Sequence, residues 1–180
     1  MFAVKELTHR YTDRFALQDI NIDFPKGEII SIIGPNGSGK STLLRLMAVL
    51  LKCQRGQIII DGKNVADQNR KSLAKQLTML PQTQDLTLDF TVRELVEFGR
   101  QPHKRTWGAL TTEDREIIDW AMSLANVQSY ANESLTSLSG GERQRAWIAM
   151  VLAQQTEYVL LDEPTTFLDI VHQLEILDVV

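Results

Sequence analysis

The sequence predicts an α/β fold in which a strand-rich core carries an inserted group of helices. The prediction depends on three observations. Residues 29–47 pass from a β-branched apolar run through a glycine-rich loop into the apolar spacing of a helix. Short runs typical of half-buried strands precede this stretch. From residue 85 to residue 138 the spacing is helical, and 180 residues are enough to enclose a core.

The N-terminal segment predicts two strands, at residues 2–7 and 17–24. The second strand has an apolar side formed by Leu17, Ile20, Ile22 and Phe24. Tyr11 is expected in the loop between the strands. Judged from composition alone, such an aromatic residue is expected to be a partly buried packing residue rather than a face on which adenine stacks.

Residues 34–41 follow the pattern G-x-x-x-x-G-K-S between a predicted strand, residues 29–33, and a predicted helix. The glycines let successive backbone amides turn inward around an anion, and the helix directs its positive end at the same point. Lys40 would reach the β- and γ-phosphates of a nucleotide, and the Ser41 hydroxyl would bind Mg²⁺. This context favours a nucleoside triphosphate site over an ordinary glycine-rich turn.

Two further strands are predicted at residues 57–61 and 77–80. The second ends at Pro81, which cannot donate to a strand ladder, so Gln82 begins a loop. A glutamine beside a phosphate site could contact Mg²⁺ or the attacking water. Its position alone fits a polar loop residue equally well.

Two capping sequences mark helices in the following segment. Thr91 and Glu94 form a capping box that opens a helix to about Phe98, and residues 111–114 cap a longer helix with acids in its first turn. The buried face of the longer helix is expected to contain Ile117, Ala121, Leu124 and Ala125.

Other residues of this segment are expected to have structural roles. Trp107 and Trp120 are predicted to be packing residues rather than ligand contacts. The basic cluster from Arg100 to Arg105 is predicted to be a solvated loop rather than a binding patch.

A second glycine-rich stretch contains Ser139, Gly140, Gly141 and Glu142. Ser139 and Glu142 have the spacing of a capping box, so a helix is expected to start here and to continue, mostly buried, to about Ala153. The two glycines would leave the first amides of this helix open to an anion. A well-capped core helix without any ligand is the alternative.

The strand predicted at residues 158–161 ends in two acids, Asp162 and Glu163. Acidic side chains at the end of a buried strand are costly unless a positive group meets them. With a phosphate loop in the same chain, Asp162 is expected to help hold Mg²⁺. Glu163 is then placed to act as general base toward the attacking water.

Composition and charge exclude several classes of protein. The formal net charge of −4 creates no positive potential that would attract nucleic acid. The single cysteine, Cys53, excludes an internal disulfide. No apolar run is long enough to span a bilayer, and residues 1–11 lack the apolar centre of a signal peptide. The chain is therefore expected to be soluble and cytoplasmic.

The phosphate loop, LSGGE at residues 138–142 and LLDEP at residues 160–164 occur in this order. Together they resemble the nucleotide-binding subunit of ATP-binding-cassette (ABC) transporters. The resemblance implies a P-loop NTPase core with a mixed sheet, an antiparallel β subdomain and an inserted helical subdomain. It implies one domain over residues 1–180, in which residues 1–81 and 155–180 form the nucleotide-binding core and residues 82–154 the helical subdomain.

The resemblance also implies roles for single residues, with ATP and Mg²⁺ as cofactors. Glu163 would be the catalytic base, assisted by Gln82 and Lys40. Ser41, Gln82 and Asp162 would form the metal site, and residues 165–169 would form the D-loop. Tyr11 would stack on adenine, which reverses the expectation from composition. The remaining nucleotide contacts would come from Gly34, Pro35, Asn36, Gly37, Ser38, Gly39, Lys40, Ser41, Thr42, Ser139, Gly140, Gly141 and Glu142.

In the family, two cassettes pair head to tail, and each ATP lies between the phosphate loop of one chain and the LSGG stretch of the other. The implied partners are therefore a second copy of the chain, transmembrane permease subunits and, indirectly, a substrate-binding protein, with no nucleic acid. The expected location is the cytoplasmic face of the plasma membrane. Residues 91–104, 142–154 and 163–177 resemble importers of ferric siderophores most closely, with cobalamin and haem importers next.

The sequence departs from the family pattern at two points. Glu142 stands where many members have glutamine, and either residue completes the capping box. The family's switch histidine is expected beyond Val180, because His172 follows the D-loop too closely to fill that role. The chain is thus expected to be a fragment or to lack one catalytic contact. The alternatives to a transport ATPase are a non-transport ABC ATPase in translation or DNA maintenance, and a nucleotide-binding module without hydrolysis.

Overall fold

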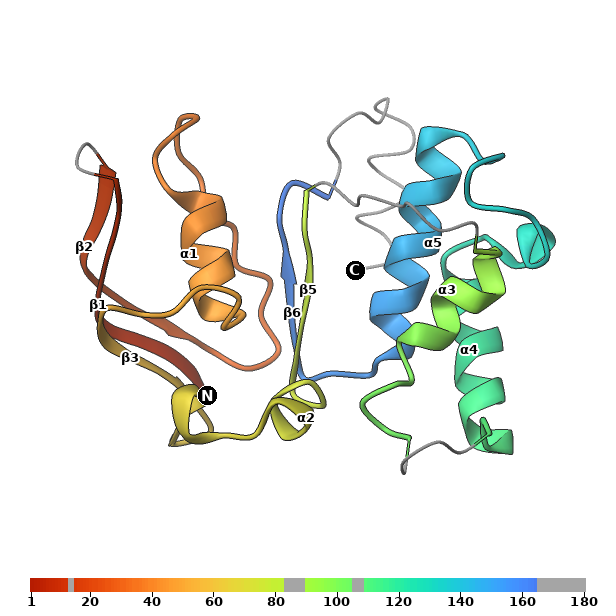
Figure 1. Ribbon diagram of the computed structural model, residues 1–180, viewed down its shortest axis with the longest axis horizontal. Coiled ribbons are helices and arrows are strands. Elements are labelled where there is room, and N and C mark those ends of the chain that lie inside the picture. The colour runs from red at the N-terminus through yellow and green to blue at the C-terminus, as the bar shows by residue number, and fades with distance from the viewer. Residues whose placement is uncertain (13–14, 83–89, 105–108, 165–180) are drawn as a thin grey trace. The chain divides into compact units, whose positions relative to one another are not determined.

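The computed structural model describes residues 1–12, 15–82, 90–104 and 109–164. The chain divides into two compact units, Met1–Leu73 and Ala74–Val180 (Figure 1). The predicted nucleotide-binding core and helical subdomain divide the chain at other points, and that division stays a prediction. No helix in the described ranges is long and apolar enough to cross a membrane.

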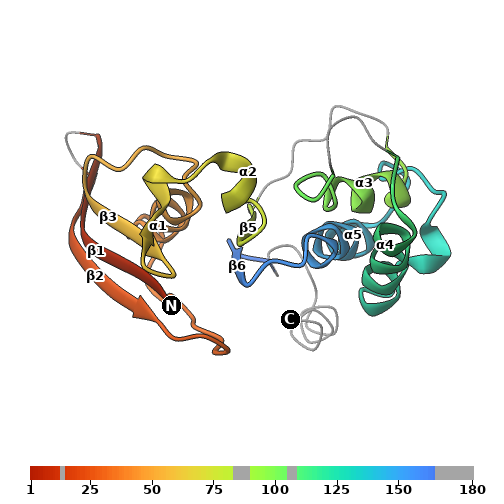
Figure 2. The ribbon, with the colours of Figure 1, turned by 90° about the horizontal axis from the view of Figure 1, so that it is seen from below.

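The first unit is an antiparallel sheet with one helix against its face (Figures 1 and 2). The strand order is β2-β1-β3-β4, and each pair of neighbours is antiparallel. Phe2, Leu7 and Ile60 on the strands and Leu46 on the helix are almost fully buried. The elements are β1 (Phe2–Thr12), β2 (Phe15–Phe24), α1 (Lys40–Met47), β3 (Arg55–Ile60), β4 (Lys63–Asn64), a 3-10 turn (Val65–Asp67) and α2 (Arg70–Leu73).

Two predictions for this unit are wrong. β1 continues to Thr12, so Tyr11 belongs to a strand and not to a loop. Residues 29–33 are irregular, and Ile29 and Ile33 are 83% and 92% exposed. A β-branched run becomes a strand only where a neighbour satisfies its amide and carbonyl groups. None of the described strands pairs with residues 29–33.

The second unit combines a helical cluster with a parallel pair of strands. The cluster contains the two predicted capped helices, α3 after Thr91 and α4 after Thr111. In the strand pair, Leu77 faces Tyr158 and Leu80 faces Leu161. The elements are β5 (Leu77–Leu80), α3 (Val92–Phe98), α4 (Thr112–Leu124), a 3-10 turn (Gln128–Tyr130), α5 (Gly140–Ala153) and β6 (Tyr158–Leu161).

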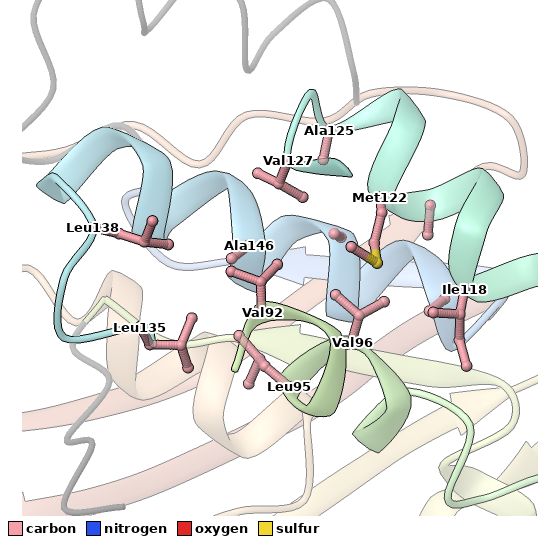
Figure 3. Close-up of a cluster of buried hydrophobic side chains, with 13 residues drawn as sticks. Val92, Leu95, Val96, Ile118, Met122, Ala125, Val127, Leu135, Leu138 and Ala146 are labelled. Atoms are coloured by element: carbon pink, nitrogen blue, oxygen red, sulfur yellow. The ribbon is translucent and has the colours of Figure 1, made fainter. Parts of the chain in front are cut away.

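The helices share one apolar core, drawn in Figure 3. Val96 of α3, Met122 of α4 and Ala146 of α5 are all fully buried in it. Gly99, at the end of α3, lets that helix approach α5 closely, because a Cβ atom there would lie 2.3 Å from the carbonyl oxygen of Met150. The other side of α5 packs on the strand pair, where Leu80, Ile148 and Val151 form a second cluster.

The predicted buried face of α4 is partly wrong. Ala121 and Ala125 are buried as expected, but Leu124 is 40% exposed and Ile117 is only partly buried. The buried stripe instead includes Asp114, Ile118 and Met122. This stripe follows the spacing of three and four residues that one helix face requires. Trp120, predicted to be a packing residue, is 48% exposed. Trp107 lies outside the described residues.

Arg100, predicted in a solvated loop, is only 5% exposed. Its Nε donates to Asp114 Oδ1 over 2.8 Å, and its Nη1 donates to the carbonyl oxygen of Ala153 over 2.9 Å. Burial raises the pKa of the Asp114 carboxyl, but hydrogen bonds from Arg100 and Thr111 outweigh burial and hold it at about 2. The ion pair of Arg100 and Asp114 therefore connects the start of α4 to the ends of α3 and α5.

Replacing Asp114 with alanine is expected to lower the free energy of unfolding by about 3 kcal/mol, because Arg100 would stay buried without its carboxylate. Urea denaturation at pH 7 measures this loss. Since folding lowers the pKa of Asp114 from 3.8 to about 2, its contribution is complete above pH 4 and is lost as the pH falls toward 2. The difference between the parent and Asp114→Ala should shrink over that range.

The matched control is Asp119→Ala on the same helix. Asp119 pairs with Arg93 over 2.7 Å, but both side chains are substantially exposed. Its loss is expected to cost less than about 1 kcal/mol. Equal losses for the two variants would contradict the role assigned to the buried pair.

Candidate functional site

The glycine-rich loop before α1 folds around the ammonium group of Lys40. Lys40 Nζ donates to the carbonyl oxygens of Gly34, over 2.9 Å, and of Pro35, over 3.1 Å. Gly37 and Gly39 have φ values of 81° and 101°, a left-handed region that favours glycine. The loop therefore keeps a positive charge beside the amides that begin α1.

The start of α1 fits an anion better than the starts of α3, α4 and α5 do. α1 has no side-chain hydrogen bond at its cap and no acidic residue in its first turn. By contrast, α3, α4 and α5 each begin with a complete capping box that contains an acid. The first amides of α1 and its positive dipole end are thus not neutralised by the chain's own carboxylates. The residues present fit a phosphate group.

The start of α5 confirms the predicted capping box. The backbone N–H of Ser139 donates to Glu142 Oε2 over 2.8 Å, and the N–H of Glu142 donates to Ser139 Oγ over 3.3 Å. A Cβ atom on Gly140 would meet nothing within 4 Å, so the cap faces open space. The Ser-Gly-Gly stretch is therefore an ordered and accessible helix start.

Tyr130 also contacts this cap, and sequence reasoning missed it. The hydrogen bonds from the Ser139 side chain and backbone, and from the Tyr130 hydroxyl, hold the pKa of Glu142 at about 2. In turn, the Glu142 carboxylate raises the pKa of Tyr130. Tyr130 lies twelve residues before Glu142 in a separate 3-10 turn, so no local spacing signals the contact.

The carboxyl ends of β5 and β6 bring two predicted site residues together. Because Leu80 and Leu161 are in register, the segments that follow them start side by side. The backbone N–H of Asp162 donates to the Leu80 carbonyl over 3.0 Å. Gln82 Nε2 donates to Glu163 Oε2 over 2.7 Å. The two residues predicted to act on the attacking water are thus in direct contact.

The two acids after β6 differ in environment. Asp162 is 2% exposed, whereas the side chain of Glu163 is exposed. An exposed carboxylate can reach a substrate, while a buried one suits a fixed supporting position. Among the described residues, no group of three or more histidines, cysteines or acids could hold a metal ion by itself.

Several predicted contacts are not tested. The phosphate loop belongs to the first unit, and Gln82, Ser139, Asp162 and Glu163 belong to the second. Their joint action therefore stays a prediction, as does the stacking role of Tyr11. The predicted D-loop, residues 165–169, and His172 lie outside the described residues.

Comparison with known sequences gives one family. The family model described as ABC transporter matches residues 17–166. The petrobactin import ATP-binding protein FpuC of Bacillus anthracis is 57% identical over 180 residues, covering 100% of this chain and 66% of the relative. The iron(3+)-hydroxamate import ATP-binding protein FhuC of Bacillus subtilis (strain 168) is 47% identical over 175 residues, covering 97% and 65%. The chain therefore spans just under two thirds of the length of these curated relatives.

Solved structures agree with this result. A dimeric bacterial ABC transporter cassette matches with a TM-score of 0.86 and 31% identity, over 99% of this chain and 81% of that one. A post-hydrolysis state of the same cassette, bound to ADP and phosphate, matches with a TM-score of 0.82 and 30% identity, over the same shares. The predicted fold class is confirmed.

The Glu142 carboxyl is expected to titrate with a midpoint near 2, measured by carbon NMR of the side chain. Because folding lowers this pKa from 4.5, the contribution of the ionised carboxyl to stability is complete above about pH 4.5 and is lost as the pH falls toward 2. Tyr130→Phe removes one donor and should raise the midpoint toward 4.5. The matched control Tyr158→Phe should leave it unchanged. A parent midpoint near 4.5 would contradict the hydrogen bonding described above.

Proposed function

Because the chain belongs to the ABC transporter family, we propose that it is the ATP-binding and ATP-hydrolysing part of an importer for iron–siderophore or related metal chelates. The named relatives, which import petrobactin and iron(3+)-hydroxamate, support the substrate class. The observation that carries the ATPase assignment is the contrast between two glycine-rich helix starts. One is uncapped and holds Lys40, whereas the other is capped but open to solvent.

The phosphate loop supplies the binding site for the nucleotide. Residues 34–42 would surround the β- and γ-phosphates, and the ammonium group of Lys40 would exchange its carbonyl partners for phosphate oxygens. Tyr11 would stack on the adenine ring. Ser41, Gln82 and Asp162 would hold Mg²⁺, which neutralises part of the phosphate charge when bound.

Glu163 would accept a proton from the attacking water, and Gln82 would orient that water. The exposed carboxylate of Glu163 and its 2.7 Å contact with Gln82 support this division of roles. A base is effective only when it is held within hydrogen-bonding reach of the proton that it removes.

The two glycine-rich helix starts suggest how a second copy of the chain would bind. A second copy would pair head to tail with this chain, and its Ser139–Glu142 stretch would bind the γ-phosphate held by the first copy's phosphate loop. A dimeric cassette among the similar structures supports this pairing. Transmembrane permease subunits would receive the movement that follows ATP binding, with the ATPase on the cytoplasmic face of the membrane and a substrate-binding protein acting indirectly.

Lys40→Ala is expected to weaken ATP binding by about 10- to 100-fold, because a charge-assisted hydrogen bond contributes about 1.5–3 kcal/mol. Titration calorimetry with Mg²⁺ and a non-hydrolysable ATP analogue measures the affinity. Lys63→Ala removes an exposed lysine from the same unit and should have no effect. Equal affinity for Lys40→Ala and the parent would exclude the proposed phosphate site.

Glu163→Gln is expected to slow ATP hydrolysis by roughly 10²- to 10⁴-fold while ATP affinity stays unchanged, because the amide cannot accept the proton from water. Single-turnover release of phosphate measures the chemical step. Glu116→Gln, the same change at an exposed position of α4, is the control. If Glu163→Gln hydrolysed ATP at the parent rate, Glu163 would not be the base.

A further inference from the structure

The side chain of Gln144 connects α5 to the segment that carries Glu163. Gln144 lies in the second turn of α5, five residues after Ser139. Its Nε2 donates to the carbonyl oxygen of Pro164 over 2.9 Å, and the contact is partly buried. None of the motif assignments gives Gln144 a role.

The backbone at Glu163 needs such support. Glu163 has a φ of 51°, in the left-handed region, which is strained for a residue with a side chain. Such a conformation persists only where surrounding contacts hold it. The next residue is proline, which has no N–H to donate, so its backbone can form a hydrogen bond only through the carbonyl oxygen.

Two glutamines therefore contact this segment, one at the Glu163 side chain and one at the Pro164 backbone. Gln82 binds the carboxylate directly, over 2.7 Å. Gln144 binds the carbonyl oxygen of the residue that follows, over 2.9 Å. If the second bond is lost, the backbone can leave the left-handed region, and the carboxylate would then turn away from Gln82.

We propose that Gln144 is a positioning residue for Glu163, which it holds in the conformation that contacts Gln82. The capped start of α5 and the carboxylate of Glu163 then move as one hydrogen-bonded unit. The effect of Gln144 on hydrolysis rests on the proposed function of Glu163. The hydrogen bond from Gln144 to Pro164 does not depend on that function.

The test follows the side-chain amide resonance of Gln82 in ¹H–¹⁵N spectra of the chain without nucleotide. Its loss in Gln82→Leu assigns the resonance, and Glu163→Ala shows where it moves when the contact is absent. Gln144→Glu keeps the size of the side chain but replaces the donor with an acceptor. It is expected to move the Gln82 resonance in the same direction as Glu163→Ala does.

The matched control is Gln128→Glu, the same change at an exposed glutamine of the same unit, which should leave the resonance in place. Gln144→Leu provides a second variant if Gln144→Glu does not fold, and the same shift is expected. A Gln82 resonance that stays at its parent position in a folded Gln144 variant would overturn the proposal.

Hydrolysis separates this proposal from the proposed function. Gln144→Glu is expected to lower kcat by roughly 10- to 100-fold, with little change in the affinity for ATP, because the base is misplaced while the phosphate loop is intact. If the Gln82 resonance moves and kcat does not fall, the positioning role holds and the assignment of Glu163 as base is wrong. If the resonance does not move, the positioning role fails whatever the rate.

Discussion

Every α-helix leaves the amide groups of its first turn without partners inside the helix, and the organisation of this chain follows from how they are satisfied. In the second unit the chain supplies its own acceptors, because α3, α4 and α5 each start with a capping box. In the first unit α1 starts after Gly39 without one. The same backbone groups thus stabilise the fold in one unit, and in the other they carry no side-chain cap and are proposed to bind a polyphosphate.

The element that integrates the second unit is α5. At its start, Tyr130 and Ser139 hold Glu142 ionised. At its end, Arg100 binds the Ala153 carbonyl, and the carboxamide of Gln154 bonds to Thr78 and to the Ala74 carbonyl. Because both ends are held by side chains from other elements, the helix has little freedom to shift without breaking polar contacts. A helix held in this way can transmit a small displacement from one end to the other.

Local contacts were predictable from the sequence because their partners lie three or four residues apart. The capping boxes predicted at Thr91 and Ser139, and the helix start predicted at Thr111, are confirmed for this reason. The parallel strands that place Gln82 near Glu163 were also within reach, since both runs end in polar residues and parallel strands end at the same edge. The 2.7 Å bond between the two side chains was not predicted.

The sequence by itself determined the starts of α3, α4 and α5, the phosphate loop and the family, because each is encoded in consecutive residues with fixed spacing. The tertiary structure alone decided that Arg100 is buried against Asp114, that Trp120 is exposed, and that residues 29–33 form no strand. It alone joined Tyr130 to Glu142 and Gln144 to Pro164. The physical reason is that burial and strand pairing depend on neighbours brought from distant parts of the chain, which no local pattern specifies.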